Sequence, residues 1–132
     1  MKYTLLTLME SSNTHWNFVG EPVKSAAYYL IGKYLHTVQV TVNNLKGRIF
    51  LEGTLSLNPT EDDWFEISLG ENGYVEYDED HIRKTDVFTF IGSYTFIRAR
   101  LDRSYLPNPD LDFNESLKNL EYGTVEKILL SY

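Results

Sequence analysis

The sequence contains no cysteine. This absence excludes disulfides, thiolate nucleophiles and cysteine-ligated zinc together. Small secreted scaffolds depend on disulfides, so a chain without them fits assembly in a reducing cytoplasm. The 132 residues are enough to bury a hydrophobic core without cross-links. We therefore predict a single domain over residues 1–132.

Long hydrophobic runs and net positive charge are also lacking. The longest apolar run, residues 26–31, is far too short to cross a bilayer. Threonines interrupt the apolar part of residues 1–10, which argues against a signal peptide. The formal net charge of −7 opposes general attraction to nucleic acid or to an anionic membrane. We expect neither as a partner.

Alternation of apolar and polar residues is the main structural signal that is present. It runs through residues 36–42 and resumes over residues 47–55, where Ile49, Leu51 and Leu55 share one side. Side chains at i and i+2 share a face only in a strand. We interpret the two runs as the central pair of an antiparallel β-sandwich. Gly47 and Gly53 have the parity of the apolar residues and indicate a bulge or a close approach of backbone.

Further strands are predicted on both sides of this pair. They cover residues 3–9, 16–18, 64–69, 87–91, 94–101 and 124–132, while residues 23–31 are compatible with strand or helix. Residues 60–63 predict one helical turn capped by Thr60, and residues 70–86 and 102–123 predict loops. The fold class is all-β, an antiparallel, jelly-roll-like β-sandwich with at most one or two short helical turns.

The loop at residues 110–121 is the sharpest chemical signal. Four of its side chains match ligand positions of an EF-hand calcium loop: Asp110, Asp112, Asn114 and Glu121. The sixth position, which needs glycine for its turn, holds Glu115. We interpret the loop as a solvated acidic segment, with calcium binding as the alternative.

No constellation for catalysis is apparent. The three histidines are dispersed, no serine lies in a nucleophile elbow, and no glycine-rich phosphate loop occurs. The acidic runs at 61–63 and 76–80 are interpreted as a helix-turn cap and a solvated loop tip. We expect no enzymatic activity, no resident metal and no cofactor.

A basic stripe is predicted on the strand at residues 94–101 and just beyond it. It comprises Arg98, Arg100 and Arg103 beside Tyr94 and Phe96. Two readings remain open. The stripe forms a subunit interface, where arginine and tyrosine are favoured, or it pairs across strands with acids such as Glu52 or Glu126. Binding of single-stranded nucleic acid is disfavoured by the acidic charge.

Trp16 and Trp64 are candidates for a ligand platform. Together with Tyr28, Tyr29 and Tyr34 they would offer flat rings to a sugar, as jelly-roll modules often do. The alternative is that these rings fill the core or pair across strands.

Six segments resemble a family of virion structural proteins from contractile-tailed marine phages, the cyanophage-type myoviruses. They are FVGEPVKSAAYY (18–29), LHTV (35–38), GRIFLEGTL (47–55), PTEDDWFEI (59–67), FIRARLDRSY (96–105) and GTVEKILLSY (123–132). The resemblance implies a non-catalytic β-sandwich subunit of the virion, assembled in the host cytoplasm. Its partners would be other virion proteins and, by virion symmetry, further copies of itself. A carbohydrate-binding module for host attachment is the alternative.

Overall fold

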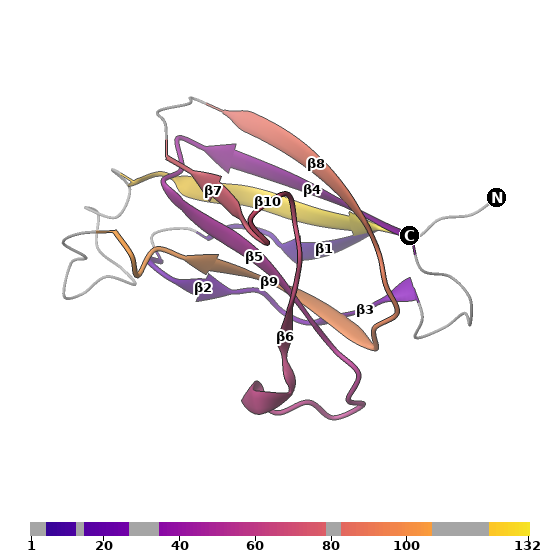
Figure 1. Ribbon diagram of the computed structural model, residues 1–132. Helices are drawn as coiled ribbons and strands as arrows, with labels where there is room; N and C mark the ends of the chain where they lie inside the picture. The colour runs from indigo at the N-terminus through magenta and orange to yellow at the C-terminus, as the bar shows by residue number, and fades with distance from the viewer. Residues whose placement is uncertain (1–4, 13–14, 27–34, 79–82, 107–121) are drawn as a thin grey trace.

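The computed structural model describes residues 5–12, 15–26, 35–78, 83–106 and 122–132. These residues form two antiparallel sheets packed as a β-sandwich, which confirms the predicted fold class (Figure 1). The strands are β1 (Leu5–Met9), β2 (Phe18–Val19), β3 (Val23–Lys24), β4 (Leu35–Asn43), β5 (Gly47–Thr54), β6 (Phe65–Ile67), β7 (Val75–Tyr77), β8 (Lys84–Ile91), β9 (Phe96–Asp102) and β10 (Thr124–Ser131).

The two sheets have different orders. The four-stranded sheet runs β1-β10-β4-β8, and the other runs β2-β9-β5-β6, with β3 also pairing with β9 and β7 with β5. The predicted helical turn is a 3₁₀ turn, η1 (Glu61–Asp63), in which the backbone amide of Thr60 donates to the Asp63 carboxylate at 2.7 Å. Within the described ranges, no helix has the length and apolar character needed to cross a bilayer.

The predicted central pair is wrong in one respect, because β4 and β5 do not pair with each other. Strand β4 pairs with β10 and β8, whereas β5 pairs with β6, β7 and β9 in the other sheet. The connection between them passes Asn44, whose φ is +54°, and buries Leu45 in the core. The chain therefore crosses from one layer to the other here. Alternation shows that a strand has one buried face, but not which strand it pairs with.

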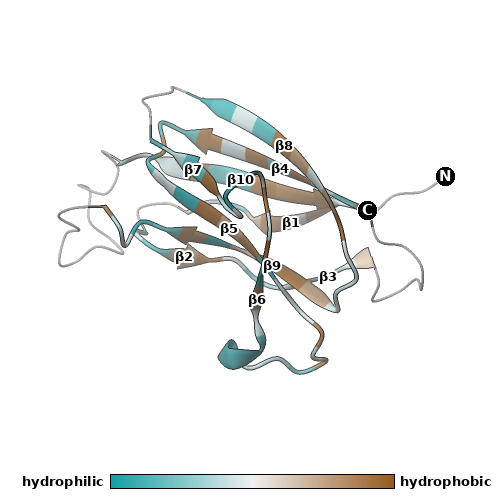
Figure 2. Cartoon of the chain, in the orientation of Figure 1, coloured by the Kyte–Doolittle hydropathy of each residue, from teal (hydrophilic) through white to brown (hydrophobic). Residues whose placement is uncertain are grey.

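The core lies between the two layers and follows the predicted alternation. Strand β4 contributes its even-numbered side chains and β9 its odd-numbered ones, and both sets are fully buried. In Figure 2 the hydrophobic residues lie along β4, β9 and β10, whereas η1 is hydrophilic. Leu55, predicted to face the core, is exposed because β5 ends at Thr54.

The segment 70–86, predicted as a loop, contains β7 and the start of β8. The segment was predicted as a loop because it is rich in acidic residues. It nevertheless contains a short alternation, in which Val75 and Tyr77 face inwards. The Tyr77 hydroxyl donates to Oδ2 of Asp86 on β8 at 2.8 Å. Since β7 and β8 belong to different sheets, this hydrogen bond joins the two layers at the edge of the core.

Tyr77 makes stability sensitive to alkaline pH. Burial, reinforced by the hydrogen bond to Asp86, raises the pKa of Tyr77 above its usual value of 10.0. Above pH 10 the unfolded chain ionises this phenol while the folded chain keeps its proton, so stability falls as the pH rises. We expect the urea midpoint of unfolding to decline less steeply above pH 10 in Tyr77→Phe. Val75→Ala, which alters β7 without removing a phenol, is the control and should decline as steeply as the wild type does.

Candidate interaction surfaces

The outer face of the six-stranded sheet carries a network of arginines and carboxylates. Arg98 lies opposite Glu52 on β5, and Nε of Arg98 donates to Oε1 of Glu52 at 2.8 Å. Arg100 donates to the other oxygen of Glu52 at 3.2 Å. The arginines of this face, including Arg48, are outnumbered by the carboxylates that they contact: Glu52, Glu61, Glu66, Glu76 and Asp102.

Arg98 is the most enclosed member of this network. Its side chain is 8% exposed, and its guanidinium lies 4.2 Å from the ring centre of Trp64. Burial by itself lowers the pKa of Arg98, but the hydrogen bonds to Glu61 and Glu52 more than offset this, so that the pKa is raised. The same contact lowers the pKa of Glu61, to which Arg98 donates with both terminal nitrogens. Arg98 thus ties η1 and Trp64 to the sheet.

We call this outer surface of the six-stranded sheet, with Arg48, Arg98 and Arg100, the arginine face. Aromatic rings also lie on it. Arg100 lies over Phe50 at 4.2 Å, and Arg48 lies over Tyr105 at 4.0 Å, each distance joining the guanidinium carbon to the ring centre. Arginine and carboxylate side chains form ion pairs with one another on this face. Glu52 therefore pairs with the arginines across strands, which was one of the two predictions for the stripe. Glu126, the other acid named for that role, is on β10 of the opposite sheet and pairs with Arg83. A phosphate group would have to displace existing ion pairs.

The predicted stripe is wrong in its third arginine. Arg103 is fully buried between the layers, where Nη2 donates to the carbonyl of Gly123 at 2.8 Å. Burial lowers the pKa of Arg103 to about 10. Arg103 has the same parity as Ile97 and Leu101, so the sequence already carried the signal that it points inwards.

Tyr94 and Phe96 also lie apart from the predicted arrangement. Tyr94 precedes β9, and its ring packs over Gly53 and towards Phe90 in the core, with ring centres 6.3 Å apart. The atoms nearest to Gly53 are therefore side-chain atoms, whereas Gly53 was predicted to mark a bulge or a close approach of backbone. Phe96 is half-buried and lies opposite Thr54 on the arginine face. The aromatic part of the stripe is therefore divided between core and surface.

The two tryptophans do not form one platform. Trp16 is buried, with its ring edge against Tyr122 at 4.9 Å between ring centres and Arg103 on one side. Trp64 is half-buried on the opposite side of the sheet, covered by Arg98. The core-filling alternative holds for Trp16, and the three tyrosines predicted to join the platform lie outside the described residues.

Metal ligands do not converge in the part of the chain that is described. No group of three or more histidine, aspartate or glutamate side chains there could hold an ion. His36 is a core residue that stacks on Phe90 at 4.8 Å and accepts a hydrogen bond from the Ala26 amide at 3.3 Å. The predicted calcium loop, Asp110, Asp112, Asn114 and Glu121, lies outside the described residues.

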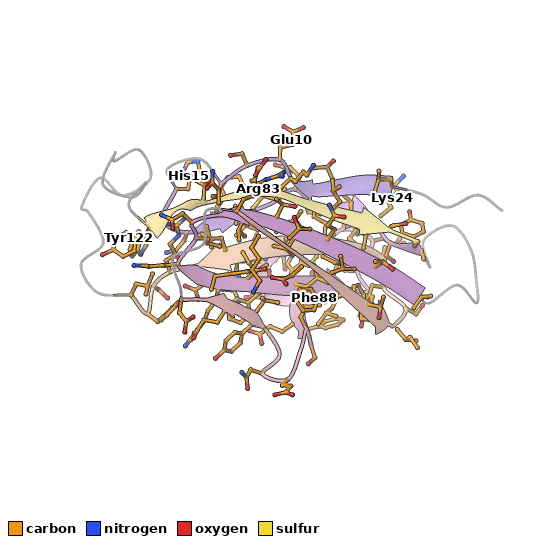
Figure 3. All side chains as sticks on the ribbon, turned by 90° about the horizontal axis from the view of Figure 1, so that it is seen from above. Glu10, His15, Lys24, Arg83, Phe88 and Tyr122 are labelled. Atoms are coloured by element: carbon orange, nitrogen blue, oxygen red, sulfur yellow. The ribbon has the colours of Figure 1, made fainter. Side chains whose placement is uncertain are left out.

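The outer face of the four-stranded sheet is a surface that the sequence reasoning missed. Figure 3 looks onto this layer, with β1, β10, β4 and β8 in order from the edge at Glu10 to the edge at Phe88. Four of its aliphatic side chains are strongly exposed: Leu5 (63%), Leu35 (58%), Val87 (58%) and Ile91 (77%). We call the outward side chains of these four strands the aliphatic face.

Cross-strand register arranges this aliphatic face in rows. Val87 lies opposite Gln39, which lies opposite Leu129, and Ile91 lies opposite Leu35. Threonines and Ser131 fill the positions between them. The signal in the sequence was the odd parity that Val87 and Ile91 share with Thr85 and Thr89, opposite to that of Phe88 and Phe90.

The fold places the chain in the class of antiparallel β-sandwich proteins. Comparison with protein-family models, with curated proteins and with solved structures finds no match.

Proposed function

We propose that this protein is a non-catalytic structural subunit that acts through protein–protein contacts. The particle to which it belongs is, on the resemblance of its sequence segments, the virion of a contractile-tailed phage. Its localisation is then the virion, after assembly in the host cytoplasm. Its chemistry is the burial of sheet surface against neighbouring subunits.

The observation that carries this proposal is the aliphatic face. Single exposed aliphatic side chains are normal. Here four of them share the outer face of one sheet, with small polar side chains between them, and larger apolar patches are typical of contact surfaces. Two further features support the same reading. The arginine face has its charges paired within the subunit, and Trp64 and η1 are fastened to it by Arg98. Both layers thus present preformed surfaces.

The test of this proposal is the composition of purified particles. We expect purified particles of the phage that encodes this chain to contain the protein. Mass spectrometry should find it in a fixed ratio to the other structural proteins. The ratio should survive a salt wash that removes loosely bound proteins. Absence of the protein from washed particles would contradict the proposal.

The carbohydrate-binding alternative has less support. Its first ring, Trp16, is buried, and one side of the second, Trp64, is occupied by Arg98. We therefore expect Trp64→Ala to reduce stability through the lost contact with Arg98. We expect neither the wild type nor this variant to bind glycans. A glycan array probed with the wild-type protein and with Trp64→Ala checks this, because binding by the wild type alone would restore the alternative.

A further inference from the structure

We propose that the aliphatic face binds the same face of a second copy of this chain, in a two-fold symmetric dimer. This inference rests on the proposed function, in that it names one partner of the contact surface.

The shape of the aliphatic face can accommodate a second copy of itself. A shallow hollow of about 110 Å³ lies near its middle, lined by Leu5, Thr37, Gln39, Val87, Leu129 and Ser131. Exposed aliphatic side chains from both edge strands, Leu5 on β1 and Val87 on β8, stand at its rim. In a two-fold contact each patch meets its own copy. The raised rim of one copy can then pack across the hollow of the other.

The charge distribution of the face is compatible with a second copy as the occupant. The chain carries a net charge of −7, so two copies repel each other over most of their surface. Among the described outward side chains of this face, the cations and anions gather at one end: Lys127 and the ion pair of Arg83 with Glu126. The rest of the face is uncharged, which lets two copies approach with little repulsion. It also lacks the basic residues with which a protein surface attracts anionic lipid.

The size of the face predicts a dimer of modest affinity. Three strands of eight or nine residues and one of five, about 4.8 Å apart and rising about 3.3 Å per residue, cover roughly 500 Å². A standard interface buries about 800 Å² on each partner. The face alone is therefore smaller than a standard interface, and we expect association in the micromolar range rather than the nanomolar range.

The first test is sedimentation equilibrium of the purified 132-residue chain from about 5 to about 500 µM, which brackets micromolar association. We expect the mean mass to rise from 15.4 kDa towards twice that value. Val87→Lys places a charge at the rim of the hollow and should hold the chain monomeric. Leu57→Lys is the matched control, because Leu57 is 68% exposed in a loop away from the face, and it should associate as the wild type does.

Three further variants test whether loss of association in Val87→Lys reflects a folding defect. Thr89→Glu adds a charge on the same face at another exposed position and should also abolish association. Because the chain has no cysteine, Gln39→Cys introduces a single thiol beside the hollow. Oxidation should cross-link Gln39→Cys into a dimer and leave Leu57→Cys monomeric.

Two results would overturn the proposal. One is a wild-type chain that stays monomeric over the whole concentration range. The other is association that persists equally in Val87→Lys and Thr89→Glu. Neither result depends on whether the protein occurs in particles, so failure of the dimer and failure of the proposed function are separable. A monomer that is nevertheless found in particles would assign the aliphatic face to a different protein.

Discussion

Gly123→Ala is expected to lower the free energy of unfolding by about 2 to 5 kcal/mol, a large share of the roughly 5–15 kcal/mol typical of a domain. Gly123 has a φ of +74°, which costs a residue with a side chain about 1–2 kcal/mol. A Cβ here would also overlap the backbone of Asn43 and Asn44, where the chain crosses between the layers. Backbone held by two sheets cannot move aside, and overpacking adds about 1–3 kcal/mol. Urea unfolding at neutral pH measures the loss.

Gly70→Ala is the matched control for this prediction. Gly70 has a similar φ of +65°, but no atom lies within 4 Å of the place that its Cβ would occupy. It should therefore show the conformational cost alone, about 1–2 kcal/mol. Equal losses in the two variants would mean that the crowding at Asn44 has no energetic effect.

Arg98→Ala is expected to cost about 2 to 3 kcal/mol. The change leaves Glu52, whose side chain is 11% exposed, with one arginine partner in place of two, and it uncovers the ring of Trp64. Removing one partner of a buried ion pair typically costs about 3–5 kcal/mol. A lower value is expected here because Arg100 still contacts Glu52 and because the Glu61 side chain is already 85% exposed to water. Chemical denaturation of the wild type and the variant gives the difference.

Two comparisons make the Arg98 prediction specific. In Arg98→Met with Glu52→Leu, both charges are replaced by apolar groups, so the loss should be smaller than in Arg98→Ala. Arg83→Ala breaks the exposed pair with Glu126 and should change stability little. If Arg83→Ala cost as much as Arg98→Ala, the enclosure of Arg98 would not be the source of its effect.

Local structure was predictable from the sequence where alternation was long. The period of two in 36–42 and 97–101 correctly assigned the buried faces of β4 and β9, because a strand in a sandwich has one side turned to the core. The cap of η1 was also predictable, since it depends on Thr60 and Asp63, which are three residues apart. The same parity, applied one step further, would have placed Arg103 inside.

Partners distant in the sequence were not predictable in this way. The period of two does not indicate that β4 pairs with β8 and β10 rather than with β5. The pairing depends on the connection at Asn44 and Leu45, through which the chain passes from one layer to the other. The aliphatic face was missed for a related reason. Leu5, Leu35 and Val87 belong to three strands that only the sheet order brings together, and each residue taken alone is unremarkable.

The position of β10 between β1 and β4 has a consequence for how the chain reaches its native state. One of the two inner strands of that sheet is made of residues 124–131, whereas its neighbour β1 is made of residues 5–9. Until β10 has been synthesised, β1 and β4 lack the strand that joins them, and their apolar sides stay accessible to water and to other chains. Folds dominated by such sequence-distant contacts have a high contact order and fold slowly, in milliseconds to seconds. Nascent chains of this protein are therefore expected to need chaperone protection until synthesis has passed residue 131.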